Sequence, residues 1–234
     1  MIFVFGFRSP YAWLADRLIE DCLPAGAAER ISRLPLWEPD AAGLAALNDA
    51  GSPSLYRPMS RERQFYILQD IRRLSRHLGY AIKWPVDPPD IRWELPHRAW
   101  LAAERLGRGQ EARRAIFAAR WERGEPICDP ATLASILRPM GLPGPAELDT
   151  APGGSRDEAF AALRLANGKG VFGLPTFIVG KQRFWGVDRL AFALSEAGLP
   201  HRSVAERWVG EAGDDQARLC DPAWAAAAAA GGPA

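Results

Sequence analysis

The sequence predicts an α/β protein in which an all-helical block interrupts a smaller α/β framework. Two strand-like runs with a helix signal between them lie between Ile2 and Trp37, which is the order and spacing of a βαβ unit. Helical periodicity follows from Pro58 to about Gly141. Later, two short strand-like runs flank Gly180-Lys181, a glycine-first pair that suits a two-residue hairpin turn.

The first strand and the first helix follow each other directly. Ile2–Phe7 is a short apolar and aromatic run, which is typical of a buried strand. Ser9 is a preferred helix N-cap, and Pro10 suits the first helical position because no partner is needed there for an N–H. The next apolar residues recur at helical spacing and predict one core-facing stripe: Tyr11, Leu14, Ala15, Leu18, Ile19 and Cys22.

After the second strand, Ile31–Trp37, the pattern changes from strand-like to helical. Apolar residues from Ile67 to Leu78 form one helical stripe. Glycines and prolines delimit three further helices. These are residues 97–106 before Gly107, residues 110–123 before Gly124, and a helix that opens at Asp129-Pro130 and ends at Gly141.

The last third of the chain predicts a helix, a hairpin and a final helix. Ser155 and Glu158 form a capping box that opens a helix ending at Gly168. Asp188 is expected to cap the final helix, Arg189–Ala197. Beyond Pro200 the signals weaken, and the alanine-rich end from Ala225 is typical of a frayed tail. The predicted hairpin strands are Thr176–Val179 and Gln182–Trp185.

Taken in order, these elements match a thioredoxin-like fold with an all-helical domain inserted after the first βαβ unit. We expect a thioredoxin-like domain formed by residues 1–45 and 150–200. The inserted helical domain is expected at residues 46–149. Residues 201–234 are expected to be a partly flexible C-terminal extension.

Charge and composition indicate a small-molecule partner. Lys and Arg number 29 against 28 Asp and Glu, so a net charge of +1 provides no field to attract nucleic acid or anionic lipid. No apolar run reaches the roughly 20 residues of a membrane helix. The N-terminus lacks a basic region and a cleavage site, so we expect a soluble, cytoplasmic protein. The three cysteines and three histidines show no disulfide or metal-ligand spacing, so no metal is predicted.

Ser9 is the candidate catalytic residue. A helix N-terminus carries partial positive charge and unpaired N–H donors, so it attracts anions. In thioredoxin-type sites that anion is a cysteine thiolate, but a serine cannot form a disulfide. Its hydroxyl can still donate a hydrogen bond to a thiolate brought by a substrate. The alternative is that Ser9 is only an N-cap.

Three segments, one near the N-terminus and two in the last third of the chain, carry a family resemblance. Phe5–Ala15 (FGFRSPYAWLA), Gly170–Phe177 (GVFGLPTF) and Phe184–Leu190 (FWGVDRL) resemble segments of 2-hydroxychromene-2-carboxylate isomerases and kappa-class glutathione transferases. More loosely, Pro58, Arg63, Tyr66 and Asp70 follow a spacing of that family, with arginine in place of lysine. The resemblance spans about residues 2–198 and implies the DsbA-type architecture, which is a thioredoxin-like fold with an inserted helical domain. It also implies glutathione as the cofactor.

The resemblance further implies which residues bind glutathione. Leu174 would present its backbone to the cysteinyl unit beside a cis Pro175, whose alternative is an ordinary trans proline at a strand start. Asp188 would bind the γ-glutamyl ammonium, although Val187 replaces a residue that is often polar in the family. Arg189, the next residue, is a further candidate for binding glutathione. Arg63 would bind the glycyl carboxylate, unless it belongs to a solvated face. Asn48 occupies roughly the position of a glutathione-contacting asparagine.

Three residues near Ser9 are candidates for contacts to a second substrate. Arg8 replaces a residue that is usually hydrophobic in the family and is expected to bind a thiolate or a carboxylate, or to point into solvent. Tyr11 and Trp13 are candidates for the wall of an aromatic pocket between the two domains. Most of the nine tryptophans are expected in the core.

The expected activity is therefore a glutathione-dependent isomerisation of a conjugated aromatic acid, with Ser9 stabilising the glutathione thiolate. A kappa-class-like glutathione transferase or peroxidase would use nearly the same residues. Two further alternatives are a thiol-disulfide oxidoreductase, which needs a cysteine where Ser9 stands, and a protein that keeps the fold without catalysis. A homodimer is implied only by the resemblance.

Overall fold

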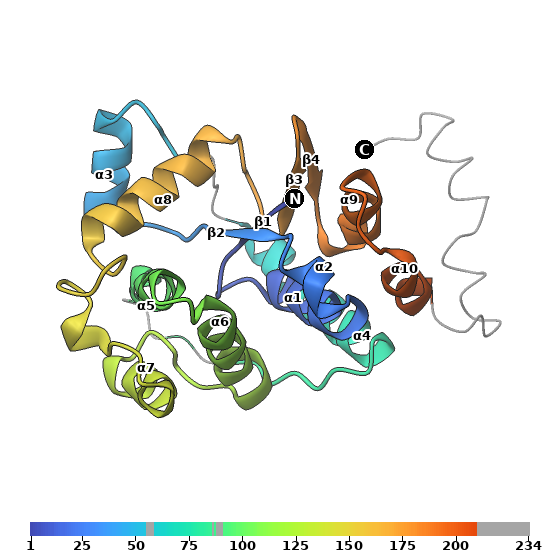
Figure 1. The fold of residues 1–234 in the computed structure, drawn as a ribbon, viewed down its shortest axis with the longest axis horizontal. Coiled ribbons are helices and arrows are strands. Elements are labelled where there is room, and N and C mark those ends of the chain that lie inside the picture. The colour runs from blue at the N-terminus through green and yellow to red at the C-terminus, as the bar shows by residue number, and fades with distance from the viewer. Residues whose placement is uncertain (55–58, 86, 88–90, 210–234) are drawn as a thin grey trace.

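A computed structural model describes residues 1–54, 59–85, 87 and 91–209, and its secondary structure follows the predicted order (Figure 1). Its strands are β1 (Ile2–Phe5), β2 (Ser32–Pro35), β3 (Thr176–Val179) and β4 (Gln182–Trp185). Its α-helices are α1 (Pro10–Cys22), α2 (Ala25–Ala28), α3 (Ala41–Asp49), α4 (Arg61–His77), α5 (Glu94–Arg105), α6 (Gly109–Ala118), α7 (Pro130–Leu137), α8 (Arg156–Gly168), α9 (Leu190–Glu196) and α10 (Arg202–Val209). A π-helical turn, η1 (Ala119–Arg123), continues α6, and 3-10 turns form η2 (Arg138–Met140), η3 (Pro145–Glu147) and η4 (Val187–Arg189).

The strands of the described residues form one mixed sheet in the order β2-β1-β3-β4. β1 and β2 are parallel and enclose α1, which confirms the predicted βαβ unit. β3 is antiparallel to both β1 and β4. Gly180, with a φ of +57°, turns β3 into β4, as the glycine-first hairpin signal predicted. The observed fold is therefore the predicted α/β, thioredoxin-like fold.

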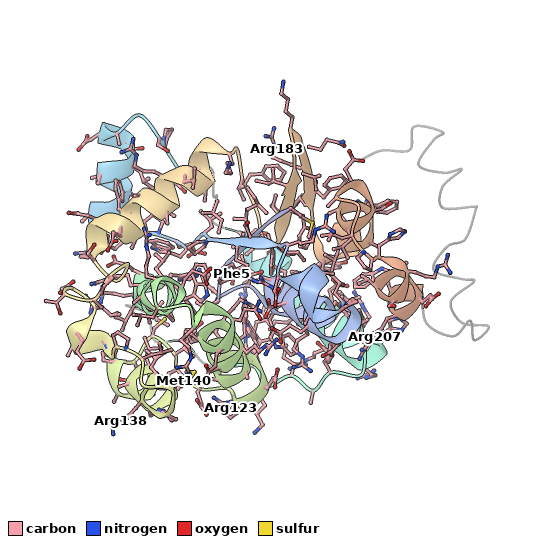
Figure 2. All side chains as sticks on the ribbon, viewed as in Figure 1. Phe5, Arg123, Arg138, Met140, Arg183 and Arg207 are labelled. Carbon is pink, nitrogen blue, oxygen red and sulfur yellow. The ribbon has the colours of Figure 1, made fainter. Side chains whose placement is uncertain are left out.

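The inserted helices share their core with β1. In Figure 1, α5, α6 and α7 gather on one side of the sheet, away from the hairpin, while α9 and α10 lie at the opposite end. Phe5, labelled near the middle of Figure 2, is fully buried. Its ring meets Trp100 of α5 edge-on at 5.0 Å and lies 5.9 Å from Phe117 of α6. Burying this aromatic surface stabilises the sheet and the helices together.

A buried ionic cluster ties α1 to α6. Arg113 of α6 donates to Asp16 and to Glu20 of α1, each at 2.6 Å. The side chains of Arg113 and Asp16 are only 1% and 3% exposed. Burial raises the pKa of the Asp16 carboxyl above its ordinary value, and the positive charge of Arg113 opposes that change.

Some elements differ from the expectations. α2 and α3 were not predicted, because their short sequences lack a clear apolar stripe. α10 was not predicted either, yet it packs against α1 and α9. The expected frayed tail from Ala225 lies outside the described residues, as does Pro58. Across the described ranges, none of the helices has both the length and the apolar character needed to cross a bilayer.

Candidate active site

Ser9 caps α1, as predicted, and keeps a free hydroxyl proton. Its backbone N–H donates to the Gly6 carbonyl at 3.0 Å, which closes the turn between β1 and α1. Its Oγ accepts a hydrogen bond from the Ala12 N–H at 3.2 Å. Within the described residues the hydroxyl donates to no acceptor, and the side chain is partly exposed. The hydroxyl proton at the positive end of α1 can therefore point to a bound anion.

The Leu174–Pro175 loop lies beside this turn, and its peptide bond is cis. A β-carbon on Gly6 would lie 2.7 Å from the Leu174 side chain and 2.5 Å from the Leu36 carbonyl oxygen, so only glycine allows this close approach. Thr176 Oγ1 donates to the Gly173 carbonyl at 2.7 Å and holds the loop closed. The backbone of Leu174 has no hydrogen-bond partner among the described residues, which leaves its N–H and C=O for a ligand.

Asp188 does not cap the last helix, and that part of the expectation is wrong. It lies inside η4, and α9 begins only at Leu190 without a side-chain cap. The Asp188 carboxylate instead pairs with Arg189 at 2.8 Å, and both side chains are about half exposed. η4 packs against α1, and the Gly186 N–H donates to the Pro175 carbonyl at 2.9 Å. Asp188 and Arg189 therefore belong to the same region as Ser9 and Pro175.

Arg8 borders a cavity of about 390 Å³ between the framework and the helical insertion. The walls include Arg8 and Glu38 on one side and Ile91, Arg92, Trp93 and Glu94 on the other. Arg8 forms an ion pair with Glu38, and its guanidinium lies 5.5 Å from the centre of the Trp93 ring. Arg92 has no ion-pair partner in the part of the chain that the structure describes, so it is the unpaired cation of this cavity.

Tyr11 is held by a carboxylate of α4. Its hydroxyl donates to Asp70 at 2.8 Å, and Asp70 also accepts from Arg73 at 3.1 Å. Burial, followed by the Asp70 hydrogen bond and charge, raises the pKa of the Tyr11 hydroxyl well above its ordinary range. Tyr11 therefore stays protonated at neutral pH and does not act as a base. This contact also places Asp70 of the loosely matching motif next to α1, while Tyr66 is exposed.

Trp13 has the position of a core residue. It is 1% exposed, its indole N–H donates to Glu122 at 3.3 Å, and its ring lies 6.0 Å from Tyr80. No substrate-accessible surface is left on it, so we do not include it in the proposed site. The exposed aromatic residues near the cis-proline loop are instead Trp185 and Phe172, whose rings are 5.0 Å apart.

Two expected glutathione-binding residues lie on exposed helix surfaces. Arg63 is in the first turn of α4, the helix that packs against α1. Asn48 is exposed near the end of α3, which lies at one edge of the molecule (Figure 1). The contacts of the structure bring neither side chain to Ser9.

His97 is a buried, neutral histidine that links the insertion to the turn before Ser9. Its Nε2 accepts from the Phe7 N–H at 3.2 Å, so the hydrogen is on Nδ1, which donates to the Trp93 carbonyl at 2.6 Å. Complete burial lowers the pKa of the imidazole from 6.5 to about 4. These contacts give His97 a structural role in the core.

We expect His97 to make stability pH-dependent in acid. Since its folded pKa is lower than its unfolded one, the unfolded chain binds the extra proton first. Its stabilisation is complete above pH 6.5 and is lost as pH falls towards 4, by about 3 kcal/mol in total. Urea unfolding of the wild type between pH 4 and 7 should show this loss. The loss of stability in acid that is due to His97 should vanish in His97→Gln. It should remain in the control variant His201→Gln, because His201 is exposed.

Sequence reasoning missed Arg92 and Glu38 as cavity residues, and it named Trp93 only as one of several tryptophans of which some could line a pocket. None of the three belongs to a motif; Glu38 reaches Arg8 because β2 runs beside β1, and Arg92 and Trp93 come from the insertion. Trp93 and Arg92 are more than 80 residues away from Arg8 in the chain, so no local pattern could pair them with it.

This arrangement, a mixed sheet with a helix N-terminus beside a cis-proline loop, defines a protein of the thioredoxin class. Residues 1–197 match the family model of the DSBA-like thioredoxin domain, and the chain belongs to that family.

The chain is also similar to characterised and solved members of this class. It is 31% identical over 197 residues to a 2-hydroxychromene-2-carboxylate isomerase of Sphingobium xenophagum, which covers 81% of this chain and 93% of that protein. A solved 2-hydroxychromene-2-carboxylate isomerase matches with a TM-score of 0.61 at 19% identity, covering 85% of this chain and 95% of that one. A probable DsbA oxidoreductase from Streptomyces coelicolor matches with a TM-score of 0.59 at 14% identity, covering 91% of each chain. The two structural matches show the fold alone.

Proposed function

We propose that the protein is an enzyme, a glutathione-dependent isomerase that acts on a conjugated aromatic acid. The observation that carries this proposal is the Ser9 hydroxyl at the N-terminus of α1, beside the Leu174 backbone: within the described part of the chain, the hydroxyl donates to no acceptor and that backbone has no hydrogen-bond partner. The relative at 31% identity is named for isomerising 2-hydroxychromene-2-carboxylate, which supports the same class of reaction here. Thiol-disulfide exchange is not favoured, because position 9 carries serine and not cysteine.

The residues of the site fit a bound thiol tripeptide. Ser9 would donate its hydroxyl proton to the sulfur, while the dipole of α1 favours negative charge there. Leu174 would offer its backbone N–H and C=O as the edge of a strand does. Asp188 would bind the ammonium of the γ-glutamyl unit. The resemblance assigns the glycyl carboxylate to Arg63, whose side chain the contacts of the structure do not bring to Ser9.

The chemistry divides between the cofactor and the chain. Bound glutathione would supply a thiolate that adds to a conjugated carbon of the substrate. The addition would turn a double bond into a rotatable single bond, and the thiolate would leave after the rotation. Ser9 would keep the sulfur unprotonated before addition and stabilise it again on departure. Because the thiolate that adds is the one that leaves, the reaction would consume no glutathione.

The cavity beside Arg8 is the proposed site for the second substrate. Its volume of about 390 Å³ suits a small aromatic ligand. The lining carries two arginines, Arg8 and Arg92, and four acids, Glu38, Asp40, Asp87 and Glu94. Arg8 pairs with Glu38, whereas Arg92 forms no ion pair with a described residue, so Arg92 is the candidate for binding a substrate carboxylate in this otherwise acidic cavity. Trp93 also lines this cavity, although only 3% of its surface is exposed.

The test is direct. Calorimetry with glutathione measures cofactor binding, and the ultraviolet absorbance of the thiolate reports its ionisation. Incubation with 2-hydroxychromene-2-carboxylate and glutathione should then form the isomer while the glutathione concentration stays constant. Consumption of glutathione would instead indicate the transferase alternative. Absence of both binding and turnover would refute the proposed function.

Asp188→Ala should weaken glutathione binding by roughly tenfold to a hundredfold, because a hydrogen bond to a charged group contributes about 1.5–3 kcal/mol. Calorimetry measures the change. Asp157→Ala is the matched control, since Asp157 is also an exposed acid in a first helical turn but lies on α8. Equal affinity in the wild type and Asp188→Ala would remove Asp188 from the glutathione site.

A further inference from the structure

The peptide groups around Phe7 are held by two side chains of the helical insertion. The Phe7 N–H donates to His97 Nε2 at 3.2 Å, and Trp121 Nε1 donates to the Phe7 carbonyl at 3.0 Å. His97 is fully buried, and Trp121 is 1% exposed. Phe7 is only two residues before Ser9 in the turn that starts α1.

Among the described residues, no other group forms a hydrogen bond with the Phe7 N–H or C=O. β1 ends at Phe5, so Phe7 has no strand neighbour to pair with. The Phe7 side chain is fully buried, with its ring 4.9 Å from His97 and 4.8 Å from Phe117. A buried backbone N–H or C=O without a partner is costly, so these two side chains fix where the turn can lie.

His97 contacts the wall of the cavity directly, and Trp121 is linked to it through Arg120. His97 Nδ1 donates to the carbonyl of Trp93, whose side chain lines the cavity beside Arg8. Trp121 belongs to the π-helical turn η1. π-Helical turns are rare in proteins overall, and those that occur are often found at functional sites. Arg120, next to it, lies over the rings of Trp93 at 4.6 Å and Trp121 at 4.9 Å. The Ser9 turn and Trp93 are therefore attached to one rigid cluster.

We propose that His97 and Trp121 are positioning residues that hold the Ser9 hydroxyl and the Trp93 wall in fixed relation. This proposal rests on the proposed function. Neither side chain touches the ligand site itself, because both are buried behind the turn. Their effect is on where the Ser9 oxygen stands relative to a bound sulfur, and a displacement of about 1 Å can reduce a rate by roughly a hundredfold.

The test compares Trp121→Phe with Trp100→Phe. Phenylalanine removes the indole N–H but keeps an aromatic ring. Trp100 is the matched control because it is also 1% exposed and donates to a backbone carbonyl, that of Gly109, at 3.0 Å within the insertion. Hydrogen exchange of the amides from Gly6 to Ala12 reports the anchoring of the turn, and Phe5 is left out because the control residue Trp100 packs against its ring. Steady-state kinetics and thiolate titration with glutathione and 2-hydroxychromene-2-carboxylate report catalysis.

Trp121→Phe should speed amide exchange in that segment by about tenfold, as expected for losing one buried hydrogen bond. It should also lower kcat by roughly 10- to 100-fold with a nearly unchanged KM for glutathione, and raise the pKa of the bound thiol. Trp100→Phe should change none of these. Unchanged exchange in Trp121→Phe, or equal effects of both variants, would overturn the proposal.

A second pair of variants tests the other hydrogen bond. His97→Leu removes the acceptor for the Phe7 N–H, whereas His97→Gln keeps a side-chain acceptor. We expect kcat to fall in the order wild type, His97→Gln, His97→Leu, and the reverse order would count against positioning. If the wild type neither binds glutathione nor isomerises the acid, the proposed function fails. The exchange comparison then still decides whether the insertion anchors the Ser9 turn.

Discussion

Ser9→Ala is expected to lower kcat by roughly 10²- to 10³-fold while glutathione still binds, because it removes a hydrogen-bond donor aimed at a developing charge. The pKa of the bound thiol should rise, since the free hydroxyl proton of Ser9 favours the thiolate. Titration of the thiolate absorbance at several pH values measures this change. Ser9→Thr retains a hydroxyl and should keep a larger part of both properties.

Ser9→Ala also removes the N-cap of α1, so its control variant must remove the N-cap of a different helix. Ser155 caps α8 through a hydrogen bond from the Glu158 N–H at 3.3 Å, close to the 3.2 Å at Ser9. Each alanine variant should therefore lose about 1 kcal/mol of stability. Ser155→Ala should leave kcat unchanged. If Ser9→Ala titrates like the wild type, Ser9 is only a cap.

Arg113→Met is expected to cost about 3–5 kcal/mol of unfolding free energy, because it leaves Asp16 buried without its ion-pair partner. Glu20 keeps a second partner, Arg114, at 2.5 Å, so the loss falls on Asp16. Urea unfolding at neutral pH measures the change.

Two controls separate the buried charge from other effects. Arg114→Met removes a neighbouring arginine of α6 that pairs with the same Glu20 but is 57% exposed, so it should cost less than about 1 kcal/mol. Adding Asp16→Asn to Arg113→Met removes the unpaired charge and should restore much of the stability. If Arg113→Met and Arg114→Met cost the same, the cluster does not stabilise the contact between α1 and α6.

The sequence predicted best where the signal is local. Ser9 and Pro10 define the start of α1, and Gly180 defines the hairpin, because caps and turns depend on neighbouring residues. Aspartate is a common capping residue, so the sequence predicted a cap at Asp188. Its actual position in η4 depends on how Gly186 bends the chain away from β4. Trp93 and Trp121 could not be predicted as neighbours of the Ser9 turn, because tertiary packing alone brings them there.

The aromatic contacts of Phe5 limit how proteins of this architecture can diverge. Trp100 and Phe117 of the insertion cover the Phe5 side chain of β1, so part of the hydrophobic core of the α/β framework comes from the insertion. A helical insertion taken from a relative would have to place aromatic side chains at the same positions for the framework to fold with it. New substrate preferences should therefore evolve through single replacements around the cavity, and wholesale exchange of the block should be rare.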